Sequence, residues 1–215
     1  MLTILLTRHG HTDRSEPEQY LGQRLVANLT DRGRADARRL AERISPIPLD
    51  RVISSPAPRA ADTAAILAGG REVETDARLV ELDYGAWEGL QLDEIERRFP
   101  GERERYEADP ANHQVGGGES GGEVARRLAP LVQEILAWWQ AERADRTCLI
   151  VGHSSVNRVL LAMCLGVPLA DYRRRFRVDW ASLTVLRWTD PGDGAMLLLA
   201  NDVAHIRGVA GATWD

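Results

Sequence analysis

The sequence contains no lysine: all 27 of its basic residues are arginines. Without lysine the chain cannot form a Schiff base with a carbonyl substrate, and it cannot build a Walker-type phosphate loop. Any site for an anion must therefore use arginine guanidinium groups, backbone N–H groups or histidine.

Cysteine is scarce, and long hydrophobic runs are absent. Cys148 and Cys164 lie in separate apolar runs without C-x-x-C spacing, so we expect small core residues in a reducing compartment. The longest apolar stretch, 159–170, is too short to cross a bilayer and contains a glycine and a proline. The first apolar run ends at Arg8, too early for a signal peptide. The sequence therefore predicts a cytoplasmic protein with no membrane partner.

The overall composition is that of a globular protein. The 215 residues are 44% hydrophobic and 27% charged, which predicts a single domain over 1–215. The formal net charge is −5, so nucleic acid is not an expected partner. Composition leaves the oligomeric state open between monomer and homodimer.

Hydrophobic periodicity predicts strands that alternate with helices. Thr30 is the expected N-cap of a helix that ends before Pro46, and a longer helix is expected from Ser120 to Trp138. Residues 100–118 are predicted to be loop, because they are rich in proline, glycine and charge. Expected strands are 2–7, 52–54, 72–75, 147–151, 183–188 and 195–200, and the remaining expected helices are 56–68, 92–99 and 155–165. This order predicts an α/β fold: a three-layer α/β/α sandwich with a mostly parallel central sheet and a hairpin near the C-terminus.

Chemically useful side chains follow the ends of several apolar runs. They are Arg8 and His9, Arg59 after Ser54-Ser55-Pro56, Glu81 after Leu79-Val80, and His153 after Val151-Gly152. Because the ends of parallel strands meet at one edge of a sheet, these groups can converge on one ligand. Together they suit phosphoryl transfer through nitrogen. An imidazole attacks phosphorus, guanidinium groups neutralise the oxygens, and a carboxylic acid protonates the leaving alkoxide.

Taken singly, each of these residues has a plainer interpretation. Arg8 and Arg59 would form surface ion pairs, Glu81 would be a solvated loop acid, and His153 would cap a helix. Only their occurrence together favours catalysis.

Six short motifs occur in order along the chain. They are Arg8-His9-Gly10-His11-Thr12, Leu29-Thr30-Asp31-Arg32-Gly33, Ser54-Ser55-Pro56-Ala57-Pro58-Arg59-Ala60, Glu81-Leu82-Asp83-Tyr84-Gly85-Ala86-Trp87-Glu88-Gly89, Gly118-Glu119-Ser120 and Gly152-His153-Ser154. The set resembles the histidine phosphatase superfamily, which has a phosphoglycerate mutase-like fold, and the resemblance extends from about Ile4 to His205. A lone R-H-G triplet is a weak signal, whereas six motifs in order are specific.

The resemblance implies a role for each catalytic candidate. His9 would be the nucleophile and become phosphohistidine, while Arg8, Arg59 and His153 would hold the phosphoryl group. Glu81 would protonate the leaving group and then act as the base for water.

His9 must be neutral at the attacking nitrogen. A carbonyl group at its other ring nitrogen would select that tautomer, and the carbonyl of Gly10 is a candidate. No metal ion or other cofactor is expected, because guanidinium groups supply the positive charge that a metal would bring.

The resemblance also nominates residues on the substrate side of the site. These are Thr12, Ser15, Gly22, Gln23, Ser154 and Asn157. Ser15 stands where the family often has asparagine, which suggests altered contacts with the leaving group. A helical or loop insertion at about 90–120 is expected over the site.

The motif at 84–90 is closer to the phosphatase branch of the family, which includes the α-ribazole phosphatases. The stretch from Glu81 to His153 also looks shorter than in cofactor-dependent mutases. We therefore expect a histidine acid-type phosphatase, a phosphoric monoester hydrolase acting on a small phosphorylated metabolite.

Three alternatives remain open at this point. They are a phosphoglycerate-type mutase, a catalytically inactive module that binds a phospho-ligand, and a serine hydrolase. The last is disfavoured because Ser154 lacks the Gly-x-Ser-x-Gly elbow.

Other conspicuous residues have less specific expectations. His11, His113 and His205 are expected to be structural or at the pocket edge. The basic run 173–177 is either a solvated helix face or a positive rim of the site. The tail after Val203 is expected either to lie over the site or to fray.

Overall fold

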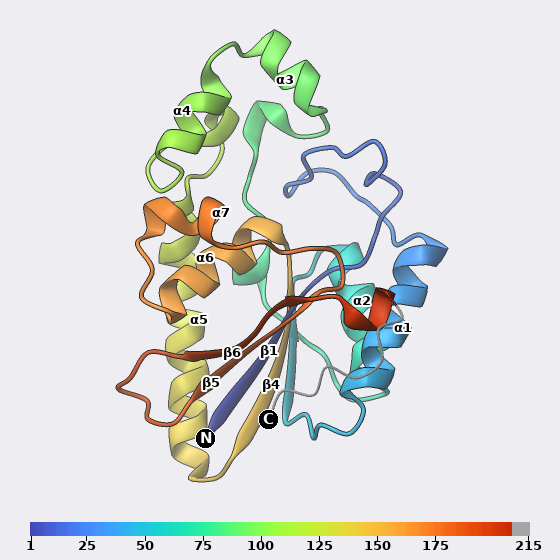
Figure 1. The fold of residues 1–215 in the computed structure, drawn as a ribbon, viewed down its shortest axis with the longest axis vertical. Coiled ribbons are helices and arrows are strands. Elements are labelled where there is room, and N and C mark those ends of the chain that lie inside the picture. The colour runs from blue at the N-terminus through green and yellow to red at the C-terminus, as the bar shows by residue number, and fades with distance from the viewer. Residues whose placement is uncertain (208–215) are drawn as a thin grey trace.

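The computed structural model describes residues 1–207, in which a six-stranded sheet lies between two layers of helices (Figure 1). The strands are β1 Leu2–Arg8, β2 Arg51–Ser54, β3 Glu74–Thr75, β4 Arg146–Gly152, β5 Leu183–Trp188 and β6 Met196–Asp202, in the spatial order β3-β2-β4-β1-β5-β6. Strands β3, β2, β4 and β1 are parallel to one another, whereas β5 is antiparallel to β1 and forms an antiparallel hairpin with β6 at one edge. The mostly parallel sheet and its C-terminal hairpin are confirmed.

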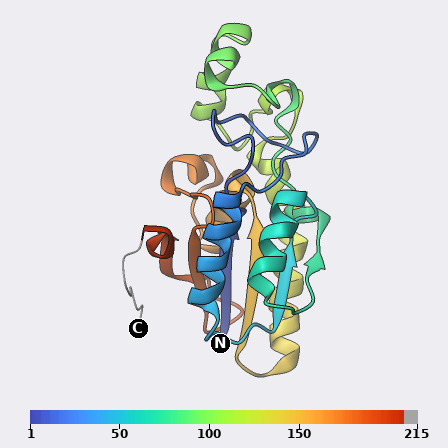
Figure 2. The same cartoon turned by 90° about the vertical axis from the view of Figure 1, so that its right-hand side faces the viewer.

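Helices lie on both faces of this sheet and beyond the carboxyl ends of β1 and β4 (Figure 1). They are α1 Asp31–Ile44, α2 Pro58–Ala68, α3 Leu92–Arg98, α4 Glu102–Ala108, α5 Gly121–Glu142, α6 Ser154–Cys164, α7 Tyr172–Arg175 and α8 Ala204–Arg207, with short 3₁₀ turns at Ala77–Leu79, Gly85–Trp87, Val115–Gly117 and Leu169–Asp171. Helices α1 and α2 lie on one face, and α5 and α6 lie on the other (Figures 1 and 2). The predicted three-layer sandwich is therefore confirmed. The part of the tail beyond residue 207, including Trp214, lies outside the described residues.

Successive side chains of a strand lie on opposite faces of the sheet, so the apolar core has two halves. Ile4 and Leu6 of β1 belong to the half that packs with α5 and α6. Leu5 belongs to the half formed with α1 and α2.

Both cysteines are buried, and neither is in a disulfide within residues 1–207. None of the helices in these residues has both the length and the apolar character needed to cross a membrane.

The prediction that 100–118 is all loop is wrong, because this stretch contains helix α4. Residues 102–108 are mostly strong helix formers, but Tyr106 is the only large apolar side chain among them, so they show no periodicity. Tyr106 is fully buried and lies edge-on to Trp87, with 6.0 Å between the ring centroids. This tertiary contact fixes α4 near the carboxyl ends of β1 and β4, at the top of Figure 1.

The start of α1 places the loop that follows β1. Thr30 accepts a hydrogen bond from the Gly33 N–H at 3.1 Å, as its predicted N-cap role requires. A Cβ atom on Gly33 would lie 2.1 Å from the carbonyl oxygen of His11. The first turn of α1 therefore packs directly against the backbone of the R-H-G motif loop, and only glycine leaves room for that approach.

We expect Gly33→Ala to lower the free energy of unfolding by about 1–3 kcal/mol, because the added methyl group overlaps backbone that cannot move freely. Alanine has a higher helix propensity than glycine, so a loss of stability must come from the overlap of the added methyl group with the His11 backbone. Urea denaturation would measure it. Gly194→Ala is the control, since its Cβ atom would meet its nearest neighbour at 3.5 Å. Equal midpoints for the two variants would contradict the tight packing.

Candidate active site

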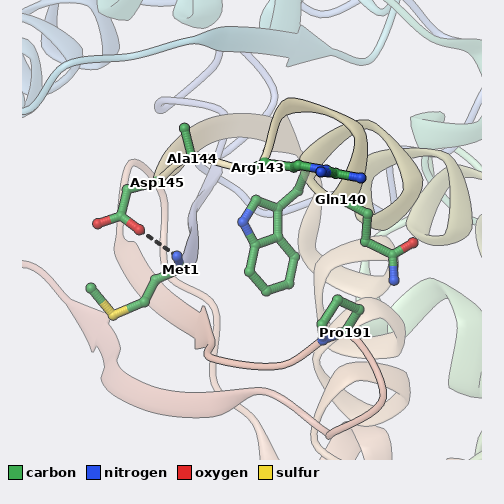
Figure 3. Close-up of a pocket in the computed structure, with 7 residues that line it drawn as sticks. Met1, Gln140, Arg143, Ala144, Asp145 and Pro191 are labelled. Atoms are coloured by element: carbon green, nitrogen blue, oxygen red, sulfur yellow. Dashed lines mark hydrogen bonds and ion pairs between the residues drawn. The ribbon is translucent and has the colours of Figure 1, made fainter.

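One cavity, of about 340 Å³, lies between the end of α5 and the β5–β6 turn (Figure 3). The amino group of Met1 faces the Asp145 carboxylate there and forms an ion pair at 2.5 Å. The lining residues described for this cavity include no histidine, serine or cysteine. This cavity therefore lacks the groups that the sequence nominated for chemistry.

A larger cavity, of about 670 Å³, lies at the carboxyl ends of β1 and β4. Its lining includes three members of the predicted catalytic set, Arg8, His9 and Glu81. Leu92 of α3 and Arg103 of α4 also line it. These three candidates thus meet at the sheet edge where parallel α/β folds bind ligands, whereas Arg59 and His153 are not among the lining residues.

The pairing of β1 with β4 brings two histidines together. Arg8 lies opposite Gly152 in the parallel register, and the His9 N–H donates to the Gly152 carbonyl at 3.0 Å. His153 follows Gly152 directly, so each histidine leaves the end of its own strand. Their ring centroids are 5.2 Å apart with an interplanar angle of 61°.

The His9 imidazole is held as one neutral tautomer. Its Nδ1 lies 2.8 Å from the carbonyl oxygen of Gly10, as expected from the sequence. A carbonyl oxygen can only accept, so Nδ1 carries the proton and Nε2 keeps its lone pair. Burial, followed by the charges of Arg8 and Arg59, lowers the pKa of His9 well below its usual value. The ring therefore presents a neutral nitrogen with a free lone pair.

His153 is fully buried beside His9. Its Nε2 is 2.8 Å from the hydroxyl oxygen of Ser55. Its Nδ1 is buried and has no hydrogen-bond partner within residues 1–207. Burial is the main cause that lowers the pKa of His153, followed by the charges of Arg59 and His9. Although His153 occupies the N-cap position of α6, its side chain makes no capping hydrogen bond.

Arg8 and Arg59 are held by backbone carbonyl groups. Arg59 is 1% exposed and donates from Nη2 to the carbonyl of Gly22 at 2.9 Å. Arg8 donates from Nη1 to Val178 at 3.0 Å, and its guanidinium lies 4.9 Å from the centre of the Trp180 ring.

Both guanidinium groups keep an unused donor. The Nε atoms of Arg8 and Arg59 are buried without a partner in the described part of the chain. Burial lowers the pKa of both side chains, but an arginine in a protein stays charged. The interpretation of Arg59 as a surface residue is excluded by its burial.

Glu81 lies at the N-terminal end of α6 and is 4% exposed. Its Oε1 accepts from the N–H groups of Leu82 at 2.8 Å and Val156 at 3.1 Å. Its Oε2 accepts from the N–H of Ser155 at 3.1 Å. Helix N-termini have unsatisfied N–H donors that favour a carboxylate. Glu81 is thus an oriented, buried group rather than a solvated loop acid.

Of the residues nominated for substrate contact, Ser15 and Ser154 line the larger cavity. Thr12, Gly22, Gln23 and Asn157 do not line it. The Oγ1 of Thr12 is 3.0 Å from the hydroxyl oxygen of Ser15, so the Ser15 hydroxyl already has a hydrogen-bond partner within the protein.

The other three nominated residues form hydrogen bonds with the catalytic candidates or with strand β1. Gly22 accepts from Arg59, as described above, and Gln23 donates from Nε2 to the Glu81 carbonyl at 2.8 Å. Asn157 donates from Nδ2 to the Thr7 carbonyl at 2.9 Å, which ties α6 to β1. Their positions indicate a structural function in holding the site.

Several contact residues carried no sequence signal. Ser55 was visible in its motif, but nothing indicated that it would reach His153. Val178 and Trp180 contact Arg8 from positions far along the chain, 170 residues away for Val178, and no local pattern marks them.

The less specific expectations have mixed outcomes. His11, His113 and His205 are not among the lining residues of the larger cavity. In the basic run, Arg173 and Arg177 line the cavity. Arg174 and Arg175 form exposed ion pairs with Asp171. The run therefore divides between the two interpretations.

No cluster of three or more His, Cys, Asp or Glu side chains within residues 1–207 is arranged to hold a metal ion. The positive charge near His9 comes from arginine. In proteins, guanidinium forks bind phosphate oxygens with well-defined geometry.

Comparisons with known proteins agree with this geometry. A family model described as the histidine phosphatase superfamily (branch 1) matches residues 4–202. A glucosyl-3-phosphoglycerate phosphatase of Mycobacterium tuberculosis is 35% identical over 198 residues, which are 88% of this chain and 88% of that protein. Phosphoserine phosphatase 1 of Hydrogenobacter thermophilus is 27% identical over 208 residues, 96% of this chain and 95% of that protein. A solved structure of a mycobacterial glucosyl-3-phosphoglycerate phosphatase complexed with VO3 superposes with a TM-score of 0.83 and 31% identity, covering 93% of this chain and 98% of that one.

Two further matches concern the mutase alternative and the resemblance to α-ribazole phosphatases. A probable phosphoglycerate mutase of Salmonella choleraesuis is 29% identical over 211 residues, 96% of this chain and 95% of that protein. The alpha-ribazole phosphatase structure from Shigella flexneri has a TM-score of 0.79 at 24% identity, covering 94% of this chain and 96% of that one. At that identity the second match shows a shared fold alone.

Replacing Arg8 by glutamine should raise the pKa of His9 towards its ordinary value of about 6.5, because one repelling charge is removed. An NMR titration of the His9 ring would measure the midpoint in both proteins. Arg39→Gln is the matched control, since Arg39 is an exposed residue of α1 paired with Asp36. The same His9 midpoint in the Arg8 variant and the control would show that Arg8 does not repel the protonated ring.

Proposed function

This chain belongs to branch 1 of the histidine phosphatase superfamily, and we propose that it hydrolyses a small phosphorylated metabolite through a phosphohistidine at His9. One observation carries this proposal above the others. The His9 ring has its Nδ1 proton tied to the Gly10 carbonyl, which leaves Nε2 free for attack beside two arginines.

Three buried nitrogen atoms of the other catalytic candidates have no hydrogen-bond partner in the described residues: the Nε atoms of Arg8 and Arg59 and the Nδ1 atom of His153. The Nδ1 atom of His153 is a donor in the tautomer in which the Ser55 hydroxyl donates to Nε2. Buried donors are costly to leave unpaired, and phosphoryl oxygens are strong acceptors. We assign these donors to the oxygens of the transferred group, where they neutralise charge that develops in the transition state.

The reaction then has two steps. In the first, Glu81 takes up a proton from solvent, Nε2 of His9 attacks phosphorus, the bond to the ester oxygen breaks, and Glu81 gives that proton to the leaving alkoxide. In the second, Glu81 takes a proton from water, the hydroxide attacks phosphorus, and the P–N bond breaks. Phosphate leaves, Glu81 returns its proton to solvent and His9 is neutral again, so the sum of both steps consumes one water.

The proposal extends to the substrate, the domain organisation, the location and the assembly. Two of the relatives named above, phosphoserine phosphatase 1 and glucosyl-3-phosphoglycerate phosphatase, are named as phosphatases of phosphorylated metabolites, which supports a similar class of substrate here. We assign the whole chain, 1–215, to one domain in which the segment 90–120 forms the insertion over the site. Leu92 and Arg103 of that segment line the cavity. Two free buried cysteines suit a cytoplasmic enzyme. All proposed catalytic groups come from one chain, so monomer and homodimer are both compatible with the site.

Phosphate release from p-nitrophenyl phosphate and a panel of metabolite monoesters should persist in EDTA and disappear in His9→Ala, because the nucleophile is then missing. His113→Ala is the control, since this histidine does not line the cavity. Quenching in alkaline detergent should also trap a phosphoenzyme in the wild type, and this species should be stable to base and labile to acid because phosphate is bound to nitrogen. A mutase would instead isomerise phosphoglycerate only with a bisphosphate primer. An inactive binding module would bind phosphate and never become phosphorylated.

Glu81→Gln should slow hydrolysis of an alkyl phosphate about 10²- to 10⁴-fold, because its poor leaving group needs a proton. The first step with p-nitrophenyl phosphate should be slowed much less, since nitrophenolate leaves without protonation. Burst kinetics with both esters would separate this step from the hydrolysis of the phosphoenzyme. If both esters slow equally in the first step, Glu81 is not the proton donor.

A further inference from the structure

The larger cavity holds more positive charge than one phosphoryl group requires. Within residues 1–207, its lining includes six arginines and three carboxylates. The arginines are Arg8, Arg14, Arg103, Arg158, Arg173 and Arg177, and the acids are Glu18, Glu81 and Asp179. The proposed phosphoryl site uses Arg8 together with the buried Arg59, which leaves five lining arginines to explain.

Two of these five are neutralised by carboxylates. Arg103 pairs with Glu96 at 2.9 Å and with Glu107 at 2.8 Å. Arg177 pairs with Asp179 at 2.9 Å. Since their guanidinium groups are already occupied, they are poor candidates for binding a substrate.

The acids of the cavity are occupied as well. Glu18 faces Arg8 at 4.0 Å, and Glu81 accepts three backbone N–H groups. Asp179 also accepts from the Nδ2 of Asn201 at 3.0 Å. No lining carboxylate in the described residues is therefore left to neutralise another arginine.

Arg158 differs from the other arginines of the cavity. It lies on α6 four residues after Ser154, which places both side chains on the same face of the helix. Both line the cavity. Arg158 has no hydrogen bond or ion pair within residues 1–207, and its Nε atom is buried without a partner. A guanidinium group facing a cavity without any partner is a ready site for an anion.

Arg173 lies on α7, which packs beside α6 (Figure 1). Its guanidinium lies 4.6 Å from the centre of the Tyr106 ring and donates to the Tyr106 hydroxyl at 3.2 Å. No carboxylate of the described residues pairs with it. The Tyr106 contacts hold the charge in place without neutralising it. Arg14 is weaker evidence, because its guanidinium donates to the amide oxygen of Gln19 at 3.1 Å.

We propose that Arg158, supported by Arg173, forms a second anion subsite that selects phosphomonoesters carrying a further anionic group, a carboxylate or a second phosphate. This inference rests on the proposed phosphatase function and narrows its substrate class. Both anions match the planar fork of a guanidinium group, which binds two oxygens at once. A cavity of about 670 Å³ has room for a metabolite larger than its phosphoryl group.

The test compares pairs of substrates that differ only in the second group. For a carboxylate, the pair is 3-phosphoglycerate and glycerol 3-phosphate. For a phosphate, it is fructose 1,6-bisphosphate and fructose 6-phosphate. The measured quantity is the ratio of kcat/KM within each pair, because general losses of activity cancel in a ratio. The pair with the larger ratio identifies the anion.

In the wild type we expect at least one ratio well above one. Arg158→Gln should lower that ratio about ten- to hundredfold, since a hydrogen-bonded charge pair is lost. Arg158→Lys should restore part of it, because the charge returns without the fork. Arg177→Gln is the matched control: it removes a lining arginine that already has a carboxylate partner, so the ratio should stay within about twofold.

Two results would overturn the subsite. One is a wild-type ratio near one in both pairs, which needs no variant and so does not depend on whether Arg158→Gln folds. The other is an equal loss on both members of a pair in Arg158→Gln, which would place Arg158 at the phosphoryl group. Turnover of p-nitrophenyl phosphate by the wild type is measured alongside. If that turnover is present and depends on His9, a failed ratio test counts against the subsite alone.

Discussion

The site depends on the parallel pairing of β1 with β4. The bond from the His9 N–H to the Gly152 carbonyl, at 3.0 Å, ends this pairing and places His153 next to His9. A one-residue shift in register would turn either histidine to the other face of the sheet. The apolar residues of β1 resist such a shift, because alternate side chains are buried on opposite faces. Core packing and catalytic geometry therefore rest on the same strand pair.

The charged side chains near the ends of β1 and β4 are buried, and this explains the polar contacts that hold them. Charged groups lose hydration when they are buried, so each one must be held by fixed polar partners. Carbonyl groups of Gly22 and Val178 hold the two arginines, and N–H groups at the start of α6 hold Glu81. Burial, followed by the charges of these two arginines, lowers the pKa of His9 and keeps its ring neutral. In the reaction that we propose, one arrangement thus activates the nucleophile and accommodates a phosphoryl dianion.

Local signals in the sequence predicted most of the secondary structure. Thr30 and Ser120 were readable as helix caps, because capping depends on residues only a few positions apart. The parallel sheet followed from the alternation of strands and helices. Helix α4 was missed, since it is stabilised by Tyr106 packing against Trp87 rather than by its own pattern. Asn157 was assigned to the substrate, yet it binds the backbone of Thr7.

The sequence by itself determined which chemical groups were available: no lysine, and a set of histidines, arginines and one glutamate at the ends of apolar runs. It also carried the motifs that identify the family. Only the tertiary structure decided which polar groups face the cavity and which are already paired. Arg103 and Arg158 look alike in the sequence, but the first has two carboxylate partners and the second has none within residues 1–207. Partners such as Val178 for Arg8 lie 170 positions away, so pairing and burial arise from the packing of distant segments.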